Sequence, residues 1–240
     1  MSGHSKWHNI QARKGAQDAK KANVFTKYAK GITIAAQKGG DPTTNFSLRL
    51  AIDKAKEVSM PKDNIDRAIK RGTGELKGEA QMEEALYEAF GPGGVAILVK
   101  AVTDNKNRTV SDLKHMLNEA GGSLGGAGSV QWMFQQWGAI TIDKGQVAKS
   151  KDELELELIE AGAEDISETE DEIEIKTKVD HLQKVVNKLK ELGIEPKEFG
   201  IKWVAKDTVP VSDEVGAKLG ELFAELEAHD DVEDYFTNAE

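Results

Sequence analysis

The sequence predicts an α+β protein in which an N-terminal three-helix domain precedes two ferredoxin-like α/β sandwich domains, the third inserted in the second. Three observations predict this fold: a helical period extends to about residue 72, a strand pattern follows residue 81, and a second α/β pattern starts at Gly138. A chain of 240 residues also suits several small domains better than one. The predicted domains are 1–80 (basic arm and three helices), 81–134 with 206–240 (α/β sandwich), and 135–205 (acidic ferredoxin-like insertion).

The first domain is predicted from three amphipathic segments that follow a polar arm, residues 1–15. Apolar residues recur at helical spacing from about Ala16 to Lys38, and Gly39 ends this predicted helix. A second helix begins at Asp41-Pro42, because proline favours the first helical turn. A third, short helix runs from Pro61 to about Arg71, with Ser59 as its candidate cap.

The period changes to that of strands in the second domain. Two apolar runs, Leu86 to Phe90 and Val95 to Val102, flank a Gly-Pro-Gly-Gly turn and predict a hairpin. A helix with its apolar face at Val110, Leu113, Leu117 and Ala120 follows, and alternating Val130, Trp132 and Phe134 predict a third strand. This ββαβ unit lacks one helix and one strand. We expect the tail, with a helix over residues 215–226 and a strand over residues 232–236, to supply them.

Residues 135–205 repeat an α/β pattern of their own. The predicted order is a strand at Ile140 and Ile142, a helix over 151–161, strands over 165–167 and 173–177, a helix over 182–192 and a strand over 199–203. The order βαββαβ is that of the ferredoxin-like fold. The segment 151–161 also alternates leucine with glutamate in a strand period, but we predict a helix because glutamate is depleted in strands and Gly162 follows as a stop.

Composition excludes several classes of function. The chain has no cysteine, which excludes disulfide scaffolds, thiol nucleophiles and thiolate metal sites. No apolar run approaches the ~20 residues of a membrane helix and no signal-peptide core opens the chain, so we expect a cytoplasmic protein without a membrane partner. We find no catalytic pair, metal-ligand cluster or cofactor motif, and therefore predict a non-enzymatic protein with no metal and no cofactor.

The charge is distributed unevenly along the chain. The net charge is −10, yet residues 1–80 carry +8 and residues 81–240 carry −18. A basic arm with one aromatic residue suits nucleic acid, because cations neutralise phosphates and a tryptophan can stack on an unpaired base. The alternative interpretation is two solvated faces of unlike charge. The candidate nucleic-acid contacts here are Lys6, Trp7, Arg13, Lys14, Lys20, Lys21, Lys27 and Lys30.

Two loops are secondary candidates. The segment Asp104 to Arg108 precedes a helix and is explained by helix capping alone, although its amide and cationic donors also suit a phosphate backbone. The glycine-rich stretch Gly121 to Gly128 lacks the strand-to-helix context of a nucleotide-binding loop. We interpret it as a mobile loop whose bare backbone approaches another molecule.

Five long segments carry a family resemblance: MSGHSKWHNIQARKGAQDAKKANVFTKYAKGI, MPKDNIDRAIKRGTG, YEAFGPGGVAILV, TDNKNRT and GGSLGGAGSVQWMF. They resemble the YebC family of probable transcriptional regulatory proteins. The resemblance implies a non-enzymatic protein of three domains, with nucleic-acid contacts at Gly3 to Trp7, His4 among them, along the first helix, and at the loops holding Asn105, Arg108 and Gly121 to Ser129.

The resemblance leaves two targets open. The family name implies DNA binding and control of transcription, whereas other members resemble ribosome-associated translation factors that bind rRNA or tRNA and aid synthesis of proline-rich stretches. The residues themselves slightly favour RNA as the target. The basic third helix is short for a DNA recognition helix; its cations are Lys62, Arg67, Lys70 and Arg71. The predicted partner is therefore nucleic acid, either DNA or the rRNA or tRNA of the ribosome.

Overall fold

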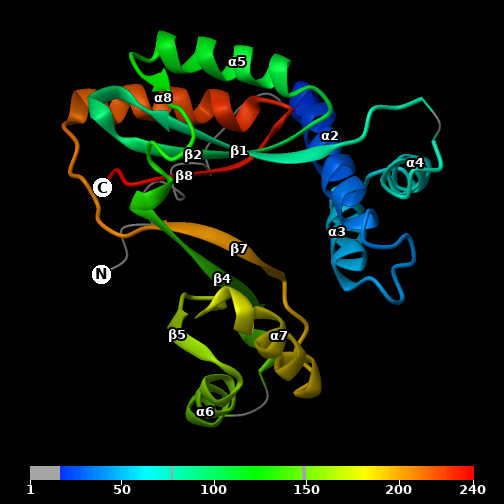
Figure 1. The fold of residues 1–240 in the computed structure, drawn as a ribbon. Coiled ribbons are helices and arrows are strands. Elements are labelled where there is room, and N and C mark those ends of the chain that lie inside the picture. Colours follow the sequence, from blue (N-terminus) through cyan, green and yellow to red (C-terminus); the bar gives the residue numbers. More distant parts are fainter. Residues whose placement is uncertain (1–16, 77, 148–149) are drawn as a thin grey trace. The chain divides into compact units, whose positions relative to one another are not determined.

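The computed structural model describes residues 17–76, 78–147 and 150–240, and side chains from Val24 onward except that of Lys151 (Figure 1). Its fold is α+β, with N-terminal helices followed by two antiparallel four-stranded sheets that carry helices, so the predicted fold class is confirmed. Internal contacts divide the chain into two compact units, one ending at Met133 and resuming at Asp207, the other comprising Phe134–Lys206. The finer division into three domains stays a prediction.

The N-terminal helices are α2 (Gln17–Ala36), α3 (Phe46–Glu57) and α4 (Lys62–Gly72). Their apolar faces meet in one core, which contains Ile32, Leu48, Ile52, Ala55, Ile65 and Ala68. Helix α3 begins later than predicted, because Asp41 forms a local turn with Thr43 and the Oδ1 of Asn45 caps the helix instead. Ser59 is not the cap of α4; it has a φ of 62°, and the capping position is Pro61.

The first sheet contains β1 (Glu83–Phe90), β2 (Ala96–Thr103), β3 (Ser123–Leu124) and β8 (Val232–Thr237), in the order β3-β1-β2-β8. Helices α5 (Lys106–Glu119) and α8 (Asp213–Ala228) cover one face of it (Figure 1). Their buried leucines pack against Ile97 and Val99 of β2. The C-terminal segment therefore completes this sheet and its core.

The predicted strand from Val130 to Phe134 is wrong. Gln131–Met133 form a 3₁₀ turn, and Phe134 begins β4 (Phe134–Asp143) of the second sheet. The backbone N–H groups of Val130 and Gln131 donate to the carboxylate of Glu88 and not to a neighbouring strand. Alternation alone could not reveal this, because the competing acceptor lies about forty positions earlier in the sequence.

The second unit has the predicted ferredoxin-like order. After β4 come α6 (Lys151–Ala161), β5 (Ala163–Glu168), β6 (Glu172–Thr177), α7 (Leu182–Glu191) and β7 (Glu198–Ala205), and the sheet order is β5-β6-β4-β7. The ambiguous segment is a helix: Ser150 and Glu153 form a capping box, and Gly162 ends it with a φ of 110°. None of the helices among the described residues is long and apolar enough to cross a lipid bilayer.

Candidate nucleic-acid interface

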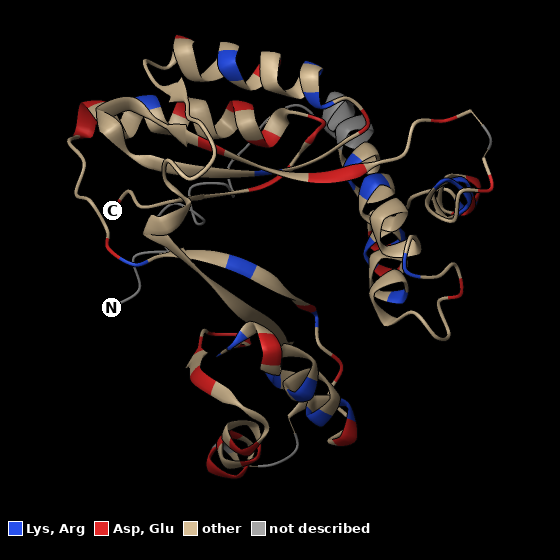
Figure 2. Ribbon diagram, viewed as in Figure 1, with Lys and Arg blue, Asp and Glu red and all other residues tan. Residues whose placement is uncertain are grey.

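Among the residues that the structure describes, helix α4 has exposed cationic side chains. Ile65 and Ala68 are buried against the other helices, so the opposite side of α4 faces solvent. Lys62, Arg67 and Lys70 are exposed, together with Asp63 and Asp66. The ribbon of α4 accordingly carries both blue and red segments (Figure 2). We call these three cations the α4 cations; they stand where a phosphate backbone can reach them.

The structure does not describe the side chains of most predicted contacts in the arm and the start of the first helix. His4, Lys6, Trp7, Arg13 and Lys14 lie outside the described residues. Helix α2 includes Lys20 and Lys21, but the description of side chains begins after them. Their role in binding stays a prediction.

Lys27 is partly buried and Lys30 is buried, and both donate to groups of their own unit. The Nζ of Lys27 donates to the carbonyl oxygen of Glu227 at 2.5 Å, and burial lowers the pKa of this lysine although Glu227 and Asp230 act to raise it. Lys30 is 9% exposed, and its Nζ donates to the carbonyl oxygens of Val102 and Asp230 at 3.0 and 2.9 Å. These two lysines hold α2 to the rest of the unit, and their contact with a phosphate backbone stays a prediction.

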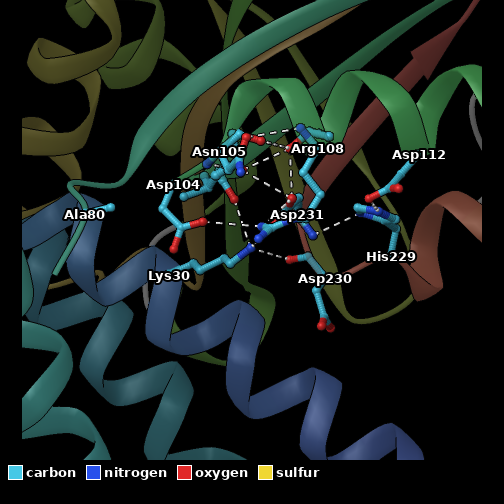
Figure 3. A network of polar contacts seen from close by, with 12 residues as sticks. Lys30, Ala80, Asp104, Asn105, Arg108, Asp112, His229, Asp230 and Asp231 are labelled. Atoms are coloured by element: carbon cyan, nitrogen blue, oxygen red, sulfur yellow. Dashed lines mark hydrogen bonds and ion pairs between the residues drawn. The ribbon is translucent and has the colours of Figure 1, made fainter.

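Lys30 ends in a polar network centred on Asp231 (Figure 3). The Asp231 side chain is 2% exposed and pairs with Lys30 and with Arg108, whose Nη2 lies 3.0 Å from Oδ2. The hydroxyls of Thr109 and Thr103 donate to the same carboxylate at 2.8 and 3.2 Å. Burial raises the pKa of the Asp231 carboxyl, but the donors from Lys30, Thr109 and Arg108 outweigh it and hold that pKa well below its usual range.

Asn105 and Arg108 occupy the start of α5. The Oδ1 of Asn105 accepts the backbone N–H of Arg108 at 3.1 Å, which confirms the capping interpretation of this segment. The Arg108 side chain is half-exposed and also pairs with Asp104 at 3.3 Å. A phosphate at this position would have to compete with two aspartates for one guanidinium, so contact with nucleic acid stays a prediction for both residues.

The glycine-rich loop is fastened by Glu88, which sequence reasoning missed. This carboxylate is buried and accepts the backbone N–H groups of Gly128, Val130 and Gln131 at 2.5, 2.7 and 2.7 Å. Burial raises the pKa of the Glu88 carboxyl, but these donors prevail and the pKa lies below its usual value. The sequence signal that could have identified Glu88 was its position as an acidic residue within the apolar run Leu86 to Phe90.

The fastened loop presents bare backbone and one aromatic side chain. Gly126, Ala127 and Gly128 are exposed, and Trp132 just beyond them is 63% exposed. The Nε1 of Trp132 donates to the carbonyl oxygen of Ser129 at 3.1 Å, which orients the ring. The surface therefore suits a ligand that approaches the backbone closely.

Sequence comparisons cover nearly the whole chain. The sequence model described as the TACO1/YebC protein N-terminal domain matches residues 5–75, and the model of the TACO1/YebC second and third domain matches residues 82–239. A protein of Petrotoga mobilis is 51% identical over 241 residues, covering 100% of this chain and 95% of its own. Proteins of Pseudothermotoga lettingae and Thermotoga maritima are 49% and 47% identical, covering 100% of this chain and 94% of their own. All three are named probable transcriptional regulatory protein.

A solved structure has the same fold. The crystal structure of a conserved hypothetical protein from Aquifex aeolicus superposes with a TM-score of 0.80 at 39% sequence identity. The match covers 96% of this chain and 95% of the other.

Proposed function

Because the chain belongs to the TACO1/YebC family, we propose that it is a non-enzymatic, nucleic-acid-binding regulator of gene expression that acts on DNA. The names of its relatives as probable transcriptional regulatory proteins support regulation of transcription. The observation that carries nucleic-acid binding is the charge distribution, with +8 on residues 1–80 of a chain whose net charge is −10. A basic end attracts a polyanion while an acidic body repels it, which orients the protein on its target.

The α4 cations are the described part of the proposed contact. Lys62 and Lys70 are exposed, and because they precede and follow the buried Ile65 and Ala68 by one turn or less, they can bind phosphates without disturbing the core. Phosphate contacts position a protein on a duplex and carry no sequence information by themselves. The arm residues Lys6 to Lys21 would add further phosphate contacts, and Trp7 would add stacking where bases are unpaired.

The proposal is tested by titrating the full-length protein into labelled duplex DNA of about 20 base pairs at several KCl concentrations. If about five phosphates are neutralised, the log–log slope of affinity against salt should be near −4.5. Lys62→Glu with Lys70→Glu should weaken binding to all sequences and reduce the slope by about 1 for each phosphate that is no longer neutralised. Lys184→Glu, an exposed lysine on α7, is the matched control and should leave both quantities unchanged.

A second measurement decides the class of nucleic acid. Crosslinking in cells, followed by sequencing of the bound nucleic acid, should recover discrete DNA sites. Recovery of ribosomal RNA alone would overturn the DNA target and favour a translation factor. Unchanged affinity in the Lys62 and Lys70 variant would remove α4 from the interface.

A further inference from the structure

We propose that the cleft between α2 and α4 binds a single unpaired nucleotide, and that Glu79 occupies its phosphate position in the free protein. The inference rests on the proposed nucleic-acid binding and extends it, because it names the form of the ligand and a residue that competes with it. The cleft, the pair of arginines at its rim and the glutamate between them carry the argument.

The cleft is lined by apolar side chains and by arginines of α4, and also by Thr26, Lys30 and Thr33. Its volume is about 280 Å³, and Phe25 and Ala29 of α2 line it together with Met60, Ala68 and Met82. Asn64, Arg67 and Arg71 of α4 complete the lining, and Asn64 and Arg67 are exposed to solvent. This volume is just below the range for small-molecule sites, about 300–1,000 Å³, so the cleft suits one base with its sugar and not a dinucleotide.

Two arginines hold one carboxylate at the rim. Arg67 and Arg71 are four residues apart on α4 and therefore share a face of the helix. The Nη2 of Arg67 lies 2.8 Å from Oε1 of Glu79, and the Nε of Arg71 lies 3.2 Å from Oε2. Each oxygen of one anion thus faces a different guanidinium, through a hydrogen bond from Arg67 and an ion pair with Arg71, and the oxygens of a phosphate can meet the same two cations.

Glu79 is suited to being displaced. It lies in the connection between α4 and β1, where Gly74 and Gly78 both have positive φ, and its side chain is 29% exposed. Exposed ion pairs contribute little to stability, and the Arg67 side chain is 73% exposed. Arg71 has two other acceptors, the carbonyl oxygen of Ala80 and Oδ2 of Asp104, each at 3.0 Å, so its position does not depend on Glu79 alone.

The ligand chemistry follows from these groups. A phosphate can replace the carboxylate between the two arginines, and the attached base can then enter over Phe25 and the methionines. The amide of Asn64 at the rim can form hydrogen bonds with a base edge. A paired and stacked base cannot enter a cleft of this kind, so the ligand is an unpaired nucleotide of a single strand, loop or end.

The test compares a single strand of about 12 nucleotides with a blunt duplex of the same length, each titrated into the full-length protein. Glu79→Gln should tighten single-strand binding about three- to tenfold more than duplex binding, because it removes the competing anion. Asn64→Trp should fill the mouth of the cleft and weaken single-strand binding by about tenfold, the loss expected when one base no longer stacks. Because Asn64 is exposed, the fold should persist, and thermal melting checks this.

Arg49→Ala is the matched control, since Arg49 is exposed on α3 over the ring of Phe46 and does not line the cleft. This substitution should change the affinities for the single strand and for the duplex by the same factor. In the unmodified protein, a 4-thiouridine strand should photocrosslink to peptides that contain Phe25, Met60 or Met82. If Glu79→Gln and Asn64→Trp change both probes equally or neither, the cleft inference fails while nucleic-acid binding stands. If the unmodified protein binds neither probe, the proposed function fails as well.

Discussion

The ion pair between Lys30 and Asp231 shows how single residues determine the packing of α2. Their side chains are only 10% and 2% exposed, and a buried charge is costly unless other groups satisfy it. Arg108, Thr103 and Thr109 satisfy the remaining oxygen positions of the carboxylate. The backbone N–H of Asp231 is satisfied too, because it donates to Nδ1 of His229 at 3.1 Å. Both oxygens and the backbone N–H of Asp231 therefore have partners, and removal of one member of the network should lower the free energy of unfolding.

Asp231→Asn should lower the free energy of unfolding by about 3 kcal/mol, because it leaves the Lys30 charge buried without its counter-ion. Urea denaturation measures this. Lys30→Met in the Asp231→Asn background should recover part of the loss, since both charges are then absent. Equal stability of the Asp231→Asn variant and the unmodified protein would show that water compensates Lys30.

The same pair predicts a dependence on pH. The pKa of Asp231 is lowered in the folded protein, so its contribution is complete above the unfolded pKa of about 3.9 and is lost as pH falls from there toward the folded value. The stability difference between the unmodified protein and Asp231→Asn should therefore be constant from about pH 5 to pH 7 and shrink below about pH 4. A difference that grows on acidification would contradict the assignment.

At the scale of elements, the start of α5 is suited to two roles, helix capping and contact with phosphate. Asn105 caps the helix through its Oδ1, and its amide nitrogen is chemically suited to a phosphate. One short segment predicts both roles, and the structure confirms the cap alone. Substitutions that separate the carboxamide oxygen from the nitrogen can distinguish them.

Asn105→Ala should cost about 1 kcal/mol of stability through loss of the cap. Asn105→Asp keeps an accepting oxygen and should leave thermal stability nearly unchanged. If Asn105 also contacts phosphate, the aspartate variant should weaken duplex binding because it replaces a donor with a negative charge. Unchanged binding in Asn105→Asp would leave the residue with capping as its sole role.

For the whole molecule, the consequential feature is that the chain leaves one compact unit after Met133 and returns to it at Asp207. The returning segment contributes α8 and β8, and β8 pairs with β2 over Ile97 to Ala101. Four buried residues of α8, Leu219, Leu222, Phe223 and Leu226, belong to the core of the first sheet. The intervening unit has its own four-stranded sheet and its own helices.

Deletion of residues 207–240 should therefore expose the core beneath β1 and β2 and abolish their protection in hydrogen exchange. An isolated 134–206 fragment should unfold in one cooperative transition, because the four strands of its sheet all belong to this segment and pair only with one another. Retained protection of β2 in the truncated protein would contradict the role of the tail. A fragment without a cooperative transition would contradict the insertion.

The sequence by itself determined the helices, most strands and the fold class, because apolar periodicity and glycine stops are local signals. Even α6, whose leucines alternate in a strand period, followed from its glutamates and Gly162. The sequence also revealed the basic half of the chain and the basic character of α4, whereas the exposure of its cations came from the structure. For α3, where Asp41 and Asn45 compete as helix starts, local signals were insufficient.

Tertiary structure alone decided which charged groups are available. Lys27 and Lys30 belong to the same lysine-rich stretch as the arm, yet both are bonded to groups some 200 residues later. Glu88 holds a loop forty residues away, and Glu79 lies between two arginines of an earlier helix. A hydrogen bond or ion pair depends on distance in space, which periodicity in sequence does not encode, so composition could identify the cations but not those already neutralised within the fold.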